Sequence, residues 1–146
     1  MKKNYEIRIA KEEEHTEIND LLNESNLCPV ESKELLANFM VMTADQKIIG
    51  VIGLEIFEGD ALLRSFAVVK EFRQKGFGSK LYTKIMEIVP VKGINQLFLL
   101  TETARTYFEL RGFEIVDRNS APKKILNSTE FKTFCPESAV CMRKIV

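Results

Sequence analysis

Tryptophan is absent from this chain of 146 residues, and histidine and cysteine are scarce. The three cysteines are Cys28, Cys135 and Cys141, and an odd number in a chain without secretory features argues against a disulfide framework. The single histidine, His15, follows the acidic run 12–14, so the sequence offers neither a cluster of metal ligands nor a cysteine–histidine pair. We therefore expect free thiols, a solvated His15 and no bound metal.

The chain also has no excess of charge and no long apolar run. Its 21 basic and 21 acidic residues give a formal net charge of zero, which provides no overall field toward nucleic acid or an anionic membrane. No apolar run approaches the roughly 20 residues of a membrane-spanning helix. Residues 1–6 lead into an alternating strand instead of the apolar centre of a signal peptide. We expect a cytoplasmic protein that binds neither nucleic acid nor membranes.

What the chain does contain is an alternation of strand-like and helix-like segments. Apolar residues at every second position predict strands, and apolar residues at helical spacing predict helices. The predicted strands cover residues 5–9, 39–42, 47–57, 61–69, 96–101, 113–116 and 138–146, and the predicted helices cover 11–22, 31–36 and 79–89. Short turns join the second, third and fourth strands into an antiparallel meander. The prediction is a mixed α/β fold in a single domain, residues 1–146.

The segment from Arg73 to Ser79 has the composition of a phosphate-binding loop, between the apolar strand 61–69 and a helix. The first turn of a helix has backbone N–H groups without helical partners and about half a positive charge from the helix dipole. The glycines at 76 and 78 leave room for phosphate oxygens beside the backbone, and Arg73 and Lys75 add positive charge. The segment therefore predicts a diphosphate ligand.

Other interpretations of the same loop fit less well or stay open. The Walker pattern is excluded because no Gly-Lys-Ser/Thr sequence ends the loop. The dinucleotide pattern needs three glycines and an acidic residue about 20 residues on. This loop has two glycines, and the apolar run 97–100 lies at that distance. An ordinary strand-to-helix turn remains open, because glycines also serve tight backbone geometry.

The loop matches the pattern Arg/Gln-x-x-Gly-x-Gly/Ala, and in this context it resembles the acetyl-CoA loop of the GNAT N-acetyltransferases. The segment 104–113, after the strand 96–101, resembles the late helix and terminal Gly-Phe of the same family. The resemblance implies a GNAT-like, mostly antiparallel central sheet of about six to seven strands, flanked by about four helices. It also implies a V-shaped splay between strands four and five that accommodates the arm of the cofactor.

The family resemblance implies direct acetyl transfer from acetyl-CoA, as co-substrate, to the amine of a small molecule. Direct transfer needs a neutral amine, a polarised thioester carbonyl and a proton for the leaving thiolate. In the family, backbone groups of the fourth strand pair with the pantetheine arm, and loop amides hold the diphosphate. The cofactor-binding residues implied for this sequence are Phe66, Ala67, Val68, Arg73, Gln74, Lys75, Gly76, Phe77, Gly78 and Ser79.

The sequence departs from the family pattern at the tyrosine that commonly protonates the thiolate. That position, four residues before Gly112, is Phe108, and Tyr107 lies one residue earlier, about 100° around the helix. Either Tyr107 or a water molecule supplies the proton, or the thiolate departs without a dedicated acid. The last alternative is tolerable because a thiol of pKa about 8.5 is a fair leaving group.

Three charged residues on the predicted strands are further candidates. For a general base we consider Glu55 on the third strand and Glu102 at the end of the fifth, with simple surface exposure as the alternative for both. Arg64, in the middle of an apolar strand, must find a partner or water. We expect Arg64 either to bind an anionic group of the substrate or to lie on the solvated side of the sheet.

Segments 62–65, 104–112, 116–118 and 131–142 narrow the resemblance to the branch of GNAT proteins encoded in arsenic-resistance operons. This branch implies an arsenical or amino-acid-like amine as acyl acceptor. Cys135 and Cys141 suggest arsenic ligation, because soft thiolates suit soft metalloids, but two structural thiols explain them better. The alternative function is a non-catalytic acyl-CoA-binding sensor. This alternative remains because Phe108 stands where the family commonly has the proton-donating tyrosine. The sequence does not decide whether the protein is a homodimer.

Overall fold

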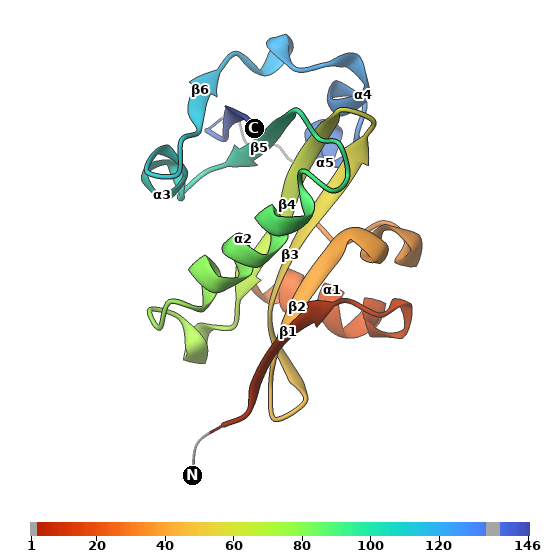
Figure 1. Cartoon of the computed structure of the whole chain (residues 1–146), viewed down its shortest axis with the longest axis vertical. Helices are drawn as coiled ribbons and strands as arrows, with labels where there is room; N and C mark the ends of the chain where they lie inside the picture. The colour runs from red at the N-terminus through yellow and green to blue at the C-terminus, as the bar shows by residue number, and fades with distance from the viewer. Residues whose placement is uncertain (1–2, 134–137) are drawn as a thin grey trace. The chain divides into compact units, whose positions relative to one another are not determined.

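Seven β-strands of residues 3–133 and 138–146, which the computed structural model describes, form one sheet with the order β1-β2-β3-β4-β5-β7-β6 (Figure 1). The strands are β1 (Tyr5–Ile9), β2 (Phe39–Ala44), β3 (Lys47–Phe57), β4 (Asp60–Val68), β5 (Gln96–Thr101), β6 (Glu114–Val116) and β7 (Val140–Ile145). Every predicted strand is confirmed, and the shortest of them, β6, has three residues.

The pairing of the strands is mostly antiparallel, as predicted. β1 to β3 pair antiparallel, and so do β5, β7 and β6. The turn between β2 and β3 has positive φ at Asp45 (49°) and Gln46 (73°), the conformation of a type I′ hairpin turn. β4 and β5 pair parallel from Asp60 with Gln96 to Leu62 with Phe98. β4 continues beyond this short ladder, so the predicted splay between the fourth and fifth strands is confirmed.

Most of the helices are short, and several helical segments are single 3₁₀ turns. The α-helices are α1 (His15–Glu24), α2 (Phe77–Ile88), α3 (Arg105–Glu109), α4 (Lys123–Leu126) and α5 (Thr129–Thr133). The 3₁₀ turns are η1 (Glu12–Glu14), η2 (Lys33–Asn38), η3 (Lys70–Phe72) and η4 (Arg118–Ser120). The predicted helix 11–22 is thus η1 followed by α1, and 31–36 is a 3₁₀ segment. No helix in the described part of the chain is long and apolar enough to cross a membrane.

The residues pack as two compact units, and β3 and β4 contribute to both. The first unit contains Met1–Leu54 and Ser65–Ile88, and the second contains Glu55–Arg64 and Val89–Val146. The prediction of one domain over the whole chain stays a prediction.

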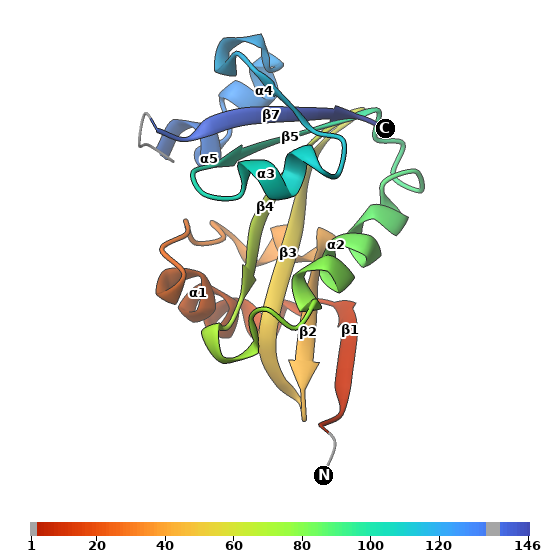
Figure 2. The ribbon, with the colours of Figure 1, turned by 90° about the vertical axis from the view of Figure 1, so that its left-hand side faces the viewer.

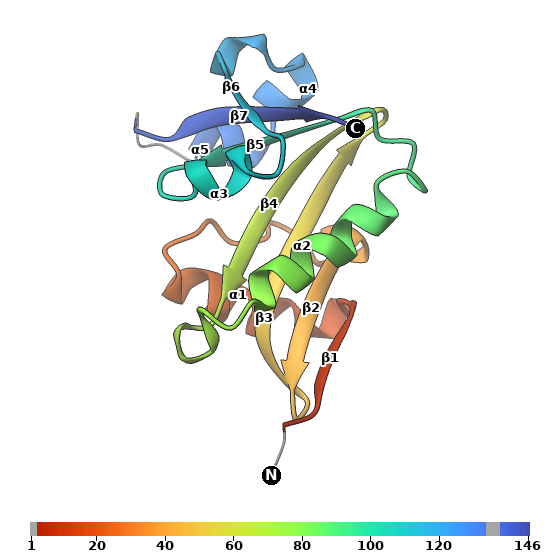
Figure 3. The same ribbon diagram turned by 60° about the vertical axis from the view of Figure 1, so that its left-hand side comes forward.

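In the first unit, α1 and α2 cover opposite faces of β2 and β3 (Figures 2 and 3). Side chains alternate along a strand, so each helix meets every second strand residue. The core on the α1 face contains Ile18, Leu21, Leu22, Phe39, Val41, Ile48 and Val51. On the other face, a Cβ at Gly50 would lie 2.9 Å from Leu81 Cδ1, so glycine lets α2 approach β3 closely. This close packing fixes where α2 begins.

In the second unit, α3 lies on one side of β5 and β7, and α4 and α5 lie on the other (Figures 1 and 2). A core cluster beneath α4 and α5 contains Leu62, Phe98, Ala121, Ile125, Phe131 and Cys141. The sequence did not predict α4 and α5. Helices of four and five residues are too short to show the apolar periodicity on which helix prediction depends.

Candidate functional site

β4 changes its backbone conformation at Ser65. This residue is buried and has a φ of 57°, in the left-handed region that non-glycine residues rarely adopt. An irregular residue inside a strand interrupts the ladder and re-aims the residues that follow, as a β-bulge does. The following residues, Phe66–Val68, are the ones predicted to pair with pantetheine.

The loop after β4 and the first turn of α2 each contain one glycine, and the two glycines have different structural roles. Gly76 has a φ of 81°, and a Cβ there would meet nothing within 4 Å, so its conformation is what requires glycine. Gly78 has no such φ, and a Cβ there would lie 3.5 Å from the Phe66 ring. Gly78 is therefore the glycine that keeps the backbone of α2 bare where it faces β4.

α2 begins at Phe77, two residues before the predicted start, and its first turn faces the loop. The Lys80 N–H donates to the Gly76 carbonyl at 3.2 Å, which starts the helical hydrogen bonding. The N–H groups before Lys80 have no carbonyl one turn earlier within the helix, and the helix dipole adds positive charge there. Such an arrangement of backbone groups binds phosphate.

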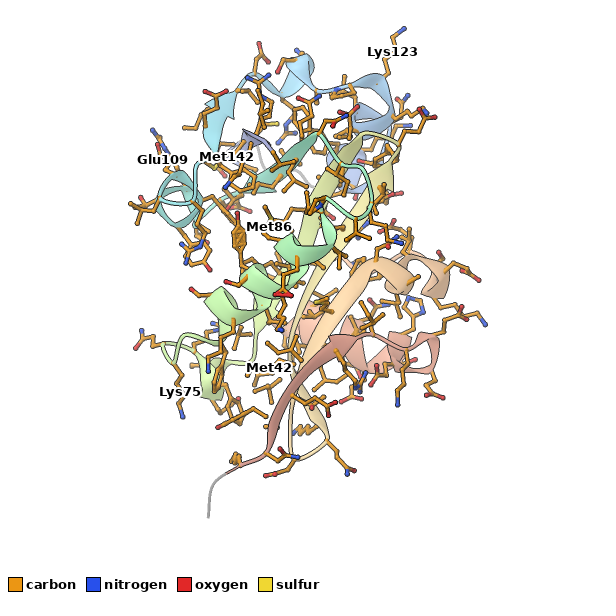
Figure 4. The ribbon with its side chains drawn as sticks, viewed as in Figure 1. Met42, Lys75, Met86, Glu109, Lys123 and Met142 are labelled. Carbon is orange, nitrogen blue, oxygen red and sulfur yellow. The ribbon has the colours of Figure 1, made fainter. Side chains whose placement is uncertain are left out.

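Cationic side chains surround this helix start, but each already has a contact. Arg73 Nε donates to the Val68 carbonyl at 2.8 Å, which ties the loop to the end of β4. Lys75 Nζ lies 5.6 Å from the centre of the Phe72 ring, and Figure 4 shows Lys75 pointing away from the ribbon. Lys80 Nζ lies 5.7 Å from the centre of the Phe77 ring. The predicted contribution of Arg73 and Lys75 to diphosphate binding stays a prediction.

In the second unit, the structure brings Arg64 and Glu55 together. Arg64 NH1 donates to Glu55 Oε1 at 2.9 Å, and Arg64 NH2 lies 3.5 Å from Glu130 Oε2. The Arg64 side chain has no exposed surface, so the alternative that it lies in solvent is wrong. Glu55 keeps 15% of its side chain exposed, and Glu130 keeps 9%. Sequence reasoning missed Glu130, because nothing around it predicts burial.

The other two catalytic candidates contact different residues. Glu102, just beyond β5, is exposed and accepts a hydrogen bond from Ser138 Oγ at 3.5 Å. The Tyr107 ring on α3 lies under the Arg111 guanidinium, whose Cζ is 3.5 Å from the ring centre. Arg111 NH1 also donates to the Tyr107 carbonyl at 3.0 Å. These contacts hold Tyr107, in the middle of α3, against Arg111, which lies just beyond the end of the helix.

Phe108, which occupies the usual tyrosine position, is a core residue. It is 6% exposed, and its ring centre lies 5.4 Å from that of Phe113. A phenylalanine satisfies this packing without a buried hydroxyl that would need a partner. The departure from the family pattern therefore has a structural explanation in the packing of α3.

The structure tests the expectations that His15 is solvated and that the cysteines are free thiols. His15 is not simply solvated, because its Nε2 donates to the Val30 carbonyl at 2.7 Å and Asn19 Oδ1 accepts from the Val30 N–H at 2.8 Å. Together they anchor the chain after α1. Cys28 and Cys141 are free thiols, as expected, and Cys135 lies outside the described residues. Burial raises the pKa of the Cys141 thiol to about 11, which disfavours the thiolate that a soft metalloid needs.

Comparison with known proteins agrees with the geometry of β4, the loop and α2. An N-acetyltransferase of Chlorobaculum tepidum, described as uncharacterized, is 29% identical over 109 residues, which are 74% of this chain and 68% of that protein. The family model described as the acetyltransferase (GNAT) domain matches residues 36–115. This match runs from η2 to β6 and includes the whole predicted acetyl-CoA loop.

Solved structures share the fold at low sequence identity. N-acetylglutamate synthase from Neisseria gonorrhoeae, complexed with coenzyme A and N-acetyl-glutamate, superposes with a TM-score of 0.81 at 19% identity, over 99% of this chain. This chain spans only 36% of that longer protein. The PaiA N-acetyltransferase from Thermoplasma acidophilum, in complex with coenzyme A, gives 0.71 at 20% identity, over 98% of this chain and 99% of that one. Since the family model matches more than half of its residues, the chain belongs to the GNAT acetyltransferase family.

Proposed function

We propose that this protein is an acetyl-CoA-dependent N-acetyltransferase that acetylates the amine of a small molecule. The observation that carries the proposal is the succession of β4, the loop with Gly76 and the start of α2, whose first turn lies beside the strand residues that follow Ser65. In the reaction, the amine nitrogen forms a bond to the thioester carbonyl carbon and the carbon–sulfur bond breaks. The amine loses a proton and the departing thiolate gains one, which leaves CoA thiol and the acetylated amine.

The proposed cofactor-binding residues all belong to the first unit. The amides from Gln74 to Ser79 would hold the diphosphate, and the backbone of Phe66–Val68 would pair with the pantetheine arm as an added strand. The residues fit this ligand, because Gly78 leaves bare backbone opposite Phe66 and Gly76 permits the left-handed turn of the loop. A backbone N–H of the Phe66–Val68 strip would polarise the thioester carbonyl.

The proposed catalytic residues and Arg64 all belong to the second unit. Glu55 and Glu102 are the proposed general bases, and Glu55 has the more defined geometry because Arg64 holds its carboxylate. Tyr107 or a water molecule would protonate the thiolate. Arg64 was expected to bind an anion, and that role stays a prediction. An anion could reach its guanidinium only after displacing a carboxylate, since the side chain has no exposed surface.

An amino-acid-like amine or an arsenical is the proposed acceptor class. The neisserial neighbour is described in complex with N-acetyl-glutamate, which supports an amino-acid-like amine for a protein of this fold. The arsenical rests on the resemblance of segments such as 62–65 to the arsenic-resistance branch. Neither acceptor requires the buried Cys141 as a ligand.

A non-catalytic acyl-CoA-binding sensor is the second candidate function. The specific observation in its favour is Phe108, which is buried and has no hydroxyl to donate to a leaving thiolate. The two candidates share the cofactor site and differ in turnover.

Release of CoA thiol separates them. Purified protein would be mixed with acetyl-CoA and a panel of amino acids, simple amines and amine-bearing arsenicals, while a chromogenic thiol reagent and mass spectrometry follow both products. We expect thiol release in step with one acetylated amine. Saturable acetyl-CoA binding without release for any amine would favour the sensor, and absence of binding would refute the loop assignment.

A further inference from the structure

A cavity lies between α2 and the edge strand β1, beside the proposed cofactor loop. It has a volume of about 310 Å³ and is lined by Ile7, Ser79, Lys80, Thr83 and Lys84. From this cavity and the side chains around it, we infer that the 3′-phosphoadenosine end of CoA binds here, with Lys80 and Lys84 in contact with the 3′-phosphate. The inference rests on the proposed acetyl-CoA site and adds the residues that favour CoA over dephospho-CoA.

One face of β1 forms the apolar side of the cavity. Tyr5 and Ile7 are two residues apart on β1, so both project from the same face of the sheet. The Tyr5 ring centre lies 4.8 Å from that of Phe77, the first residue of α2, so this is the face that α2 covers. Tyr5 is 41% exposed, so part of its ring remains accessible beside Ile7. An accessible aromatic ring next to an apolar surface suits a nucleobase, because bases stack on aromatic side chains.

Two lysines of α2 form the charged side of the cavity. Lys80 and Lys84 are four residues apart, so their side chains are neighbours on one face of the helix. Lys80 Nζ lies 5.7 Å from the centre of the Phe77 ring, which places this ammonium group next to the aromatic side of the cavity. Lys84 Nζ lies 3.8 Å from Glu87 Oε1, with both side chains more than half exposed. Such an exposed pair is weak, so a phosphate can compete for Lys84.

Further lysines surround the aromatic rings at this end of α2. Lys3 Nζ lies 4.9 Å and Lys75 Nζ 5.6 Å from the centre of the Phe72 ring, and the Phe72 and Phe77 ring centres are 6.2 Å apart. Contacts of exposed ammonium groups with aromatic rings are weak, and the ammonium groups keep N–H donors for other partners. The chain as a whole has no net charge, so this local concentration of lysines is a specific feature of this region. It complements the charge of a phosphate.

Ser79 connects the cavity with the proposed diphosphate site. It lines the cavity, and it is also the last residue of the segment whose amides are proposed to hold the diphosphate. In CoA the diphosphate is attached directly to the adenosine, so the nucleoside must lie next to those amides. The volume of about 310 Å³ is near the lower end of the range for ligand sites, about 300–1,000 Å³. The cavity therefore fits the nucleoside end of the cofactor, while the pantetheine arm would follow β4.

Ligands that differ by one group test the inference through binding alone. Calorimetric titration of the whole chain would compare CoA with dephospho-CoA, which lacks the 3′-phosphate, and adenosine 3′,5′-bisphosphate with 5′-AMP. We expect the ligand with the 3′-phosphate to bind about tenfold more tightly in each pair, because two exposed ion pairs contribute roughly threefold each. Equal affinities within both pairs would overturn the inference.

Lysine variants test which residues contact the 3′-phosphate. Lys80→Gln should weaken binding of CoA and leave dephospho-CoA unchanged, which reduces the preference to about threefold, and adding Lys84→Gln should remove the preference. Both lysines are exposed, so the variants should fold. Lys33→Gln is the matched control, because it removes the same charge from an exposed side chain of the same unit, and it should keep the full preference. A preference that persists in the double variant would show that the 3′-phosphate binds elsewhere.

Tyr5 variants test the contact with the nucleobase. Tyr5→Leu should weaken CoA and dephospho-CoA alike, by about fivefold, because the base loses its aromatic contact. Binding of 4′-phosphopantetheine, which has no nucleoside, should not change. Tyr5→Phe keeps the ring and should bind all three ligands as the unaltered protein does. If Tyr5→Leu binds CoA with unchanged affinity, the placement of the base beside Tyr5 is wrong.

The outcomes separate the inference from the proposed function. If the protein releases thiol with an amine but binds CoA and dephospho-CoA equally, the inference is wrong and the proposed function stands. If no amine is acetylated but CoA keeps a preference that depends on Lys80, the proposed function is wrong and the nucleotide site stands. If a second copy of the chain covers the cavity instead, the double lysine variant would change the sedimentation coefficient and leave the ligand preference unaltered, which would also overturn the inference.

Discussion

At the scale of single residues, the Cys141 thiol shows how burial changes chemistry. It lies in the core with Leu62 and Phe131, and removal from water raises its pKa from 9.0 to about 11. Below pH 9 the thiol is protonated in both the folded and the unfolded chain, so its contribution to stability is fully present. Between pH 9 and 11 only the unfolded chain loses the proton, and that contribution is lost.

We therefore predict that Cys141→Ala changes how stability depends on pH. Urea unfolding from pH 7 to 10.5 should show that the variant is less stable at neutral pH by about 1–2 kcal/mol, because a cavity forms. The gap should close as the pH rises above 9 and reverse in sign toward full titration, because the pKa difference of the Cys141 thiol corresponds to up to roughly 2–3 kcal/mol. Ile125→Val, which trims the same core without removing a titratable group, serves as control and should differ from the unaltered protein by the same amount at every pH. A gap of constant size would show that the Cys141 thiol does not titrate differently in the two states.

The sequence alone identified candidate residues whose type is unusual for their surroundings. Arg64 and Glu55 stood out as charges within apolar strands, and the structure joins them at 2.9 Å. Glu130 did not stand out, because a glutamate in a polar stretch is normally solvated. His15 was misjudged for a related reason: its partner is a backbone carbonyl 15 residues away, and a backbone group leaves no trace in the sequence.

At the scale of elements, the end of α3 explains the Gly-Phe sequence. The Phe113 N–H donates to the Phe108 carbonyl at 3.0 Å and the Gly112 N–H to the Glu109 carbonyl at 3.1 Å, which is the Schellman motif. Gly112 has the left-handed φ of 90° that this motif requires. The Phe108 and Phe113 rings then pack together across the helix end. The motif thus closes a five-residue helix that has little intrinsic stability.

Gly112→Ala should therefore destabilise the protein by about 1–2 kcal/mol, because a Cβ is strained at this φ. Steric crowding contributes less than backbone strain, because the atom nearest to that Cβ is the end of the flexible Lys144 side chain at 3.4 Å. Gly112→Asn is the matched comparison and should lose less, as asparagine tolerates the left-handed region better. Denaturant unfolding measures both. Equal losses for the two variants would indicate crowding in place of backbone strain.

Strands and helices were predicted correctly where the apolar pattern extends over many residues, and they were missed where the element is too short to show such a pattern. β3, with eleven residues, has the bounds that its apolar pattern predicted. No helix was predicted in the segment 118–133, although η4, α4 and α5 all lie in it, because each has five residues or fewer. Their positions depend on side chains such as Ile125 and Phe131 that pack on distant strands, and tertiary packing of this kind has no local sequence signal.

At the scale of the whole molecule, acetyl-CoA binding should raise the free energy of unfolding, because a ligand that binds only the folded state shifts the unfolding equilibrium toward that state. At a hundredfold excess over its dissociation constant the gain is about 2.7 kcal/mol, which corresponds to a rise in Tm of roughly 5–11 °C for a protein of this size. A thermal unfolding series with increasing acetyl-CoA measures the rise.

Gly78→Glu should remove that rise while the protein still unfolds cooperatively. The new carboxylate would stand at the start of α2, where the diphosphate is proposed to bind, and a Cβ there makes only an ordinary contact with Phe66 at 3.5 Å. Thr16→Glu is the matched control, because it adds the same charge at an exposed position of α1 in the same unit and should keep the acetyl-CoA response. If Gly78→Glu is stabilised by acetyl-CoA as much as Thr16→Glu is, the cofactor binds elsewhere. The loop after β4 would then be an ordinary strand-to-helix turn.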